Sequence, residues 1–184
     1  MRVLHLAPGG HLCGIATYTS NLISNFKGKD SHSLFEIPPK LELSRLNKSE
    51  ILSFFEDFVN KAQDYDVVHI QNEYGLFCGS HPLSFGLKVY YKILLGLKKN
   101  NKRCFTTFHS EPVFLKALGV LNFEERKCAR AWRKICKLFT LQNNMHGICH
   151  TKVSQNKFIR SGMRNIHVVT HGVISRSIDH RRSL

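Results

Sequence analysis

Short apolar runs alternate with helical patterns along the whole chain, and this alternation limits the fold more than any other feature. Each run is too short for a helix and predicts a buried strand; the runs are 3–7, 33–37, 66–71, 103–108, 145–150 and 165–170. Between them, apolar residues recur three or four positions apart, which predicts helices over about 15–26, 49–65, 82–99, 123–139 and 152–161. This order favours an α/β fold: a doubly wound, mostly parallel, Rossmann-like sheet with helices on both faces.

Prolines and a serine suggest where several elements begin and end. Pro38 and Pro39 close the second strand, and Pro82 fits the first turn of a helix. Ser49 is suited to cap the helix that runs to about Tyr65. The stretch 40–48, between the second strand and Ser49, is therefore expected to be a loop.

A glycine-rich turn follows the first strand and contains Gly9, Gly10 and Gly14. Glycine lets the backbone approach an anion, and the N–H groups in the first turn of the following helix point toward it. The spacing differs from that of the dinucleotide-binding motif. Two interpretations stay open at this point: a phosphate cradle, or a turn that only allows tight packing of strand and helix.

Polar loops follow four of the predicted strands. They comprise Gly9–Gly14, Gln71–Tyr74, His109–Glu111 and His171–Gly172. Because ligands of open α/β sheets bind outside the carboxyl ends of the strands, these loops should line one wall of a cleft. We therefore expect the functional site at this edge of the sheet.

The composition is that of a soluble globular domain with an unusual charge. The 184 residues are 42% hydrophobic, but the net charge is +14 and the isoelectric point about 9.8. Such a balance favours nucleic acid, an anionic membrane or phosphorylated ligands as partners.

The sequence has neither a signal peptide nor an apolar stretch long enough to span a membrane, and six cysteines without a C-x-x-C pair are typical of free thiols in the cytosol. A cytoplasmic protein is predicted.

The eleven histidines do not indicate a metal site. None of the predicted helices carries two histidines at the spacing that zinc sites use. His146 and His150 are four residues apart on a predicted strand, which separates their backbones by about 13 Å. His5 and His69 fall in buried strands and are interpreted as core histidines with hydrogen-bond partners.

Four segments, in order, resemble the N-terminal domain of GT-B-type retaining glycosyltransferases of family four (group 1). They are Gly9–Tyr18 after the first strand, Asp66–Phe77, Thr106–Pro112, and Gly147–Thr151 continuing through Ile166–Val173. The proline that usually precedes the last His-Gly-Val is Thr170 here. The resemblance implies an acceptor-side domain over 1–173, the start of a linker or tail over 174–184, and the absence of the second, donor-binding domain.

The resemblance also implies roles for individual residues. Gly10, Gly14 and Ile15 would approach the donor diphosphate, and His109 would be the catalytic-site histidine beside the transferred sugar. Residues expected to bind the acceptor or the sugar are Glu73, Tyr74, Ser110, Glu111 and His171. The partners would be a nucleotide sugar and a hydroxyl acceptor, such as a glycan or a lipid-linked molecule, and no cofactor or metal is expected.

The basic helix predicted over 123–139 suggests a further partner. Its outward residues are expected to be Arg126, Lys127, Arg130, Arg133, Lys134 and Lys137. Such a face attracts anionic headgroups, so the chain could sit peripherally at the cytoplasmic membrane. The alternative is a solvated basic face without a partner.

Two other function classes compete with a catalytic domain. One is a non-catalytic subunit that holds an acceptor or works with a partner chain carrying the second domain. The other is a nucleic-acid-binding module, which is disfavoured because the sequence lacks an RNP-like strand, a helix-turn-helix and a zinc finger. A nucleotide-dependent oxidoreductase is disfavoured by the glycine spacing.

Overall fold

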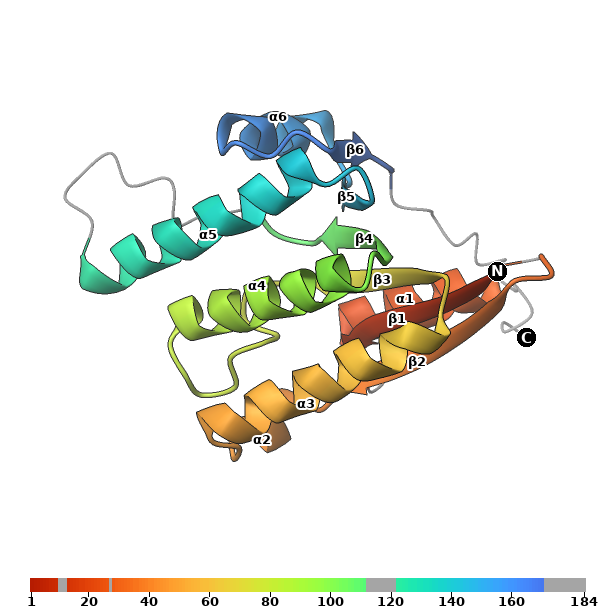
Figure 1. Ribbon diagram of the computed structural model, residues 1–184, viewed down its shortest axis with the longest axis horizontal. Helices are drawn as coiled ribbons and strands as arrows, with labels where there is room; N and C mark the ends of the chain where they lie inside the picture. The colour runs from red at the N-terminus through yellow and green to blue at the C-terminus, as the bar shows by residue number, and fades with distance from the viewer. Residues whose placement is uncertain (10–12, 27, 112–121, 171–184) are drawn as a thin grey trace, which may run out of the picture.

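The computed structural model describes residues 1–9, 13–26, 28–111 and 122–170 of the chain. Its centre is a six-stranded sheet in which every neighbouring pair is parallel, in the order β2-β1-β3-β4-β5-β6 (Figure 1). The strands are β1 Arg2–Pro8, β2 Ser31–Ile37, β3 Val67–Asn72, β4 Arg103–Phe108, β5 Met145–Cys149 and β6 Ile166–Val168. The predicted doubly wound, Rossmann-like α/β fold is therefore confirmed.

Helices connect the strands on both faces of the sheet. They are α1 Gly14–Ser24, α2 Lys40–Leu43, α3 Lys48–Lys61, α4 Leu83–Lys99, α5 Phe123–Leu141 and α6 Lys152–Arg160, with a short 3-10 helix at Ala62–Asp64. The connection through α1 leads from β1 to its neighbour β2 at one end of the sheet, whereas every later connection leads toward β6 at the opposite end. Since such crossovers are right-handed, α1 covers one face and α3 to α6 cover the other. Figure 1 shows α1 across β1 and β3 from α3 and α4.

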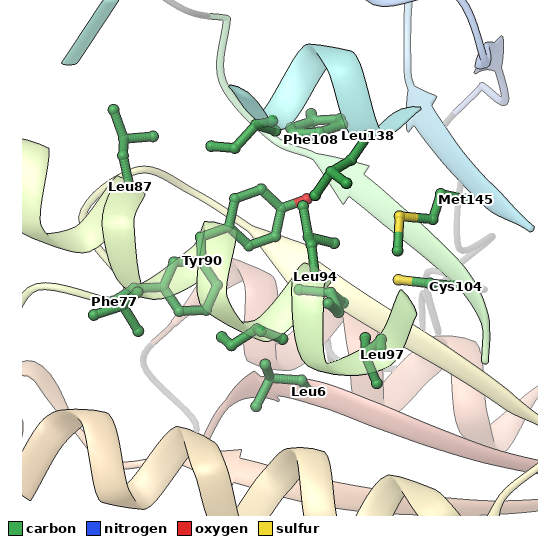
Figure 2. Packing of buried hydrophobic residues seen from close by; sticks show 14 of the residues in the cluster. Leu6, Phe77, Leu87, Tyr90, Leu94, Leu97, Cys104, Phe108, Leu138 and Met145 are labelled. Atoms are coloured by element: carbon green, nitrogen blue, oxygen red, sulfur yellow. The ribbon is translucent and has the colours of Figure 1, made fainter. Parts of the chain in front are cut away.

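The hydrophobic core fills the space between the sheet and α3, α4 and α5. Leu6 of β1 and Cys104 of β4 face side chains of α4 there, including Tyr90 and Leu94 (Figure 2). The Tyr90 hydroxyl donates a hydrogen bond to Thr106 Oγ1 at 2.9 Å, which satisfies a buried polar group. Each large apolar side chain buried in this way contributes about 1.5–3 kcal/mol.

The prediction of a loop over 40–48 is wrong in part, because α2 forms a turn of helix at Lys40–Leu43. Leu43 is buried in the core, and this burial stabilises a helix too short to show a periodic pattern. The predicted cap is also wrong. Asn47, not Ser49, caps α3: its Oδ1 accepts hydrogen bonds from the N–H groups of Ser49 and Glu50 at 2.9 and 3.1 Å.

Two helix ends differ from the prediction as well. The helix expected to reach Tyr65 ends at Lys61 and tightens into the 3-10 turn. The first helix ends at Ser24, so Phe26 lies beyond it and is exposed, with its ring 4.3 Å from that of His32. In both cases the apolar pattern continues past the point where the backbone leaves the helix.

Candidate functional site

Three aromatic rings meet at the carboxyl edge of the sheet. Tyr18 comes from α1, His109 directly follows β4, and His150 follows β5. The ring centroids of His109 and His150 are 5.6 Å apart, and the Tyr18 centroid lies 5.5 and 5.8 Å from them. The strand order reverses between β1 and β3, because the chain passes from β1 to β2 on one side and later to β3 on the other. Open α/β sheets bind ligands at the carboxyl ends of the strands beside such a switch point.

The buried side-chain amide of Gln71 forms a hydrogen bond with the His109 ring. Gln71 of β3 pairs in register with Thr107, two residues before His109, and it is 0% exposed. Gln71 Oε1 lies 2.7 Å from His109 Nε2, so the imidazole donates through Nε2–H. The backbone N–H of His109 also donates to the Asn72 carbonyl at 3.0 Å. Both ends of the residue are thus fixed to the central strand.

His150 is held in the opposite way. Its Nδ1 lies 2.9 Å from the carbonyl oxygen of Val169. A carbonyl only accepts hydrogen bonds, so Nδ1 of His150 carries a proton. The chain segment after β6 therefore sets the orientation of a ring that sits beside His109.

The structure places Glu111 against α6. Glu111 forms an ion pair with Lys157 and accepts a hydrogen bond from the Ser154 hydroxyl at 3.2 Å. Ser110 is half-buried between His109 and Glu111 in the chain. The carboxylate of Glu111 is thus engaged with α6, and it anchors the loop that carries His109.

Glu73 and Tyr74 diverge although they are neighbours in sequence. Tyr74 is 7% exposed and packs its ring against Trp132 in the core, where burial raises the pKa of its hydroxyl well above 10. Glu73 is exposed and lines a cavity of about 540 Å³ together with Gly9, Cys13 and Lys40. The structure therefore brings Glu73, and not Tyr74, to the open side of the glycine turn.

The described part of the glycine turn has one crowded and one open position. A Cβ on Gly9 would lie 1.5 Å from Glu36 Oε1, so a side chain there would displace the carboxylate. A Cβ on Gly14 would meet no described atom within 4 Å, and this residue begins α1. Ile15 is buried beneath the turn. Gly10 and His171, both predicted site residues, lie outside the described residues.

A chain of imidazoles runs from the neighbourhood of the site across the face of the sheet that α1 covers. His5 Nε2 lies 2.9 Å from His32 Nδ1, and His5 Nδ1 lies 3.2 Å from His69 Nδ1. His69 Nε2 lies 2.8 Å from Thr107 Oγ1. The interpretation of His5 and His69 as core histidines with partners is confirmed. Burial, together with a smaller contribution from the neighbouring histidines, lowers the pKa of His5 to about 4 and that of His69 to about 3.

The described residues do not contain three His, Cys, Asp or Glu side chains placed to hold one metal ion. All six cysteines are free thiols, as predicted. Among the helices that the structure describes, none combines the length and the apolar character that a membrane crossing requires.

No family model matches the sequence, and no curated protein matches it significantly. A solved structure does match: Anabaena Alr3699/HepE, crystallised in complex with UDP. The match covers 94% of this chain and 44% of that one, with 13% sequence identity and a TM-score of 0.55. The likeness shows the fold. The chain therefore spans less than half the length of a UDP-bound protein with the same α/β architecture.

Sequence reasoning placed His109 and the loop that begins at Gln71 at this edge, but it did not group them with Tyr18 and His150. Tyr18 falls within the helix predicted over 15–26, Gln71 begins a polar loop, and His150 ends the strand predicted over 145–150. Only the strand register could have grouped them, because Gln71 pairs with Thr107 and Thr107 with Ile148, two residues before His150. That register is a property of the sheet as a whole.

Proposed function

We propose that the chain is the acceptor-side domain of a GT-B-type retaining glycosyltransferase that uses a nucleotide sugar. The observation that carries the proposal is the convergence of the turn at Gly9 and Gly14, Gln71, His109 and His150 at one carboxyl edge. The likeness to Alr3699/HepE supports it, because that protein was crystallised with UDP. A fold alone does not specify function, so the argument rests on the site.

In this proposal the site acts by positioning and by electrostatic preorganisation. The open backbone at Gly14, at the N-terminus of α1, faces the donor diphosphate, where helix N–H groups favour negative charge. His109 hydrogen-bonds the transferred sugar. Glu73, exposed beside the 540 Å³ cavity, binds acceptor hydroxyls.

Replacing His109 with alanine is expected to lower sugar transfer by about 100-fold, as when one preorganised hydrogen-bonding group is lost. The measurement is release of UDP from UDP-sugars by the purified chain, alone and with a partner chain carrying a second domain. Circular dichroism checks that the variant folds. UDP binding without turnover in either arrangement would favour the non-catalytic subunit, and the absence of both would overturn the proposal.

Replacing Gly14 with tryptophan is expected to weaken UDP binding by about 10-fold or more, a loss of about 1.4 kcal/mol. A Cβ at this position, beside the helix N-terminus, meets no described atom within 4 Å, so the fold should persist. Calorimetry with UDP measures the effect. The matched control is Gly28→Trp: a Cβ there would make only ordinary contacts with Asp30, at 3.8 Å, and the residue lies between α1 and β2 at the amino edge. Equal affinities of both variants would contradict the assignment.

We also propose that the groove between α4 and α5 binds an anionic membrane surface. All six basic residues predicted to face outward on α5 are exposed. The residues that line a groove of about 590 Å³ include Lys48, Lys88, Lys92, Lys127, Arg130 and Lys134, beside apolar side chains such as Phe85 and Leu95. Glu124 is the one acid among the described lining residues, and its carboxylate accepts the Ser84 N–H at 2.8 Å. The groove therefore concentrates positive charge on one surface.

The triple variant Lys88→Gln, Lys92→Gln, Lys134→Gln should bind vesicles containing phosphatidylglycerol about 100-fold more weakly than the native chain. Each lysine contributes about 1 kcal/mol near an anionic surface, and about 3 kcal/mol corresponds to this factor. Co-sedimentation with phosphatidylcholine vesicles, with and without phosphatidylglycerol, measures it. The control with the same charge change is Lys98→Gln, Lys99→Gln, Arg160→Gln. Equal binding to both vesicle types would remove the membrane proposal.

A further inference from the structure

We propose that the outer edge of β2 is a dimer interface, at which β2 of a second copy of this chain pairs antiparallel about a twofold axis through Leu34. β2 lies at one end of the sheet (Figure 1), and within the described ranges no strand pairs with its outer side. The two sheets would then join into one continuous sheet with β2 and its copy at the centre. Such a dimer would form whether or not the chain transfers sugars.

The backbone of β2 offers hydrogen-bonding groups to a further strand. In a parallel pair, every second residue of a strand bonds to the same neighbouring strand. The Ser31 N–H donates to the Met1 carbonyl at 3.0 Å, so the odd-numbered residues of β2 bond to β1. The residues whose N–H and C=O groups point away from β1 are therefore His32, Leu34 and Glu36.

The β2 edge lacks the features that usually protect an exposed strand. Native proteins keep strand edges apart with lysines, prolines or very short strands. β2 has seven residues with neither lysine nor proline among them, whereas β6, at the opposite end of the sheet, has three. Leu34 is 42% exposed, and Phe26, whose ring lies against that of His32, is 49% exposed. The edge is therefore open to pairing and partly apolar.

The distribution of charge favours a second copy as the partner. The net charge of +14 makes two copies repel each other over much of their surface. Residues 3–26 contain no Asp, Glu, Lys or Arg, and they include all of α1, which together with Leu34 and Glu36 lines a groove of about 670 Å³. A basic chain can approach its copy on this side with little repulsion. A nucleic acid or an anionic membrane would gain no attraction there.

The sequence of β2 is complementary to itself. With the axis through Leu34, this residue faces the second copy's Leu34, and His32 faces the second copy's Glu36. Of the antiparallel registers with such an axis, only this one pairs all three outward-facing residues, and each pair exchanges two backbone hydrogen bonds. Two apolar side chains then meet on the axis, and each Glu36 carboxylate lies opposite an imidazole and not opposite another carboxylate.

Size-exclusion chromatography with light scattering should give about twice the 21.1 kDa of the chain at high concentration and the single mass on dilution, because dimerisation follows mass action. Leu34→Lys sets two ammonium groups on the axis and should raise the dimer dissociation constant by about 100-fold or more. Leu34→Pro should also weaken the dimer, because it removes an outward N–H and no bond to β1. Leu41→Lys, the same change at a 71% exposed residue of α2, is the matched control and should leave the mass unchanged.

Amide hydrogen exchange followed by NMR tests the register. In the native dimer the N–H groups of His32, Leu34 and Glu36 should be protected, and those of His32 and Glu36 should exchange about 10-fold faster or more in Leu34→Lys. The N–H groups of Ser33 and Phe35, which bond to β1, should stay protected in both proteins. A native chain that is monomeric at every concentration, or a dimer that survives in folded Leu34→Lys and Leu34→Pro, would overturn the proposal. Protection of the outward N–H groups that does not change on dilution would also overturn it, because a segment of the same chain would then occupy the edge.

Discussion

Acidification from pH 7 to pH 5 is expected to lower the free energy of unfolding by about 4 kcal/mol, through His5 and His69 alone. Their folded pKa values of about 4 and about 3 lie below the unfolded value of 6.5. Below pH 6.5 the unfolded chain therefore binds protons that the folded chain does not. Each ring then contributes about 1.4 kcal/mol of destabilisation per pH unit, and stability is lost as the pH falls toward the folded pKa values.

The hydrogen-bond chain explains why these rings stay neutral. Neutral imidazoles can pass all hydrogens in one direction along His32, His5, His69 and Thr107, so that every link has one donor and one acceptor. A proton added to His69 would place a charge on a buried ring that already faces other histidines. Burial is the larger cause of the low pKa of His69, and the neighbouring histidines His5, His109 and His32 also disfavour its protonation.

Urea unfolding at pH 7, 6 and 5 measures this loss. His69→Gln keeps a polar side chain for Thr107. It should remove one of the protons taken up on unfolding, and so reduce the slope of the free energy of unfolding against pH accordingly. The control is His146→Gln with His167→Gln, a pair of rings at the exposed end of the sheet, which should leave most of the slope in place. A stability that stays flat between pH 7 and pH 5 would show that the buried rings do not resist protonation.

Replacing Trp132 with alanine is expected to cost about 3–5 kcal/mol, a large share of the 5–15 kcal/mol that stabilises a typical domain. Trp132 of α5 is 0% exposed. Its ring centroid lies 5.8 Å from that of Tyr74 and 6.0 Å from those of Phe108 and Phe158. The cavity left by the truncation would therefore lie among three rings contributed by different elements.

The same substitution should also change the geometry of the candidate site. Phe108 is the last residue of β4 and directly precedes His109, so loosening its packing should disturb the bond between His109 and Gln71. Thermal unfolding followed by circular dichroism measures the stability loss. Trp132→Phe should recover most of it, and Phe123→Ala, on the same helix but 72% exposed, should change stability little. Equal losses for Trp132→Ala and Phe123→Ala would contradict the core assignment.

The element pattern was largely readable from the sequence. The strand predicted over 103–108 coincides with β4, and the basic residues of α5 face outward as its apolar spacing indicated. Both succeed because the period of burial is a local property, about 3.6 residues in a helix and continuous in a strand buried on both faces. α2 was missed because Leu43 gains its stability from the core and not from its neighbours in the chain.

The site was readable only in outline. The sequence located His109 at the carboxyl end of a strand, which the structure confirms, but grouped Tyr74 with Glu73 although their side chains part at the end of β3. Both residues lie beyond the last residue of β3, in the turn that follows it, which buries the Tyr74 ring in the core and leaves Glu73 exposed. The sequence of a polar loop does not show which of these two side chains is buried.

The sequence by itself thus determined the α/β class, the order of the elements and the edge where polar loops collect, because these depend on spacing along the chain. Only the tertiary structure decided that Gln71, His109, Tyr18 and His150 meet, and that His5, His32 and His69 form one buried chain. These contacts join residues far apart in sequence. They depend on which strands pair and in which register, and that choice belongs to the packed sheet as a whole.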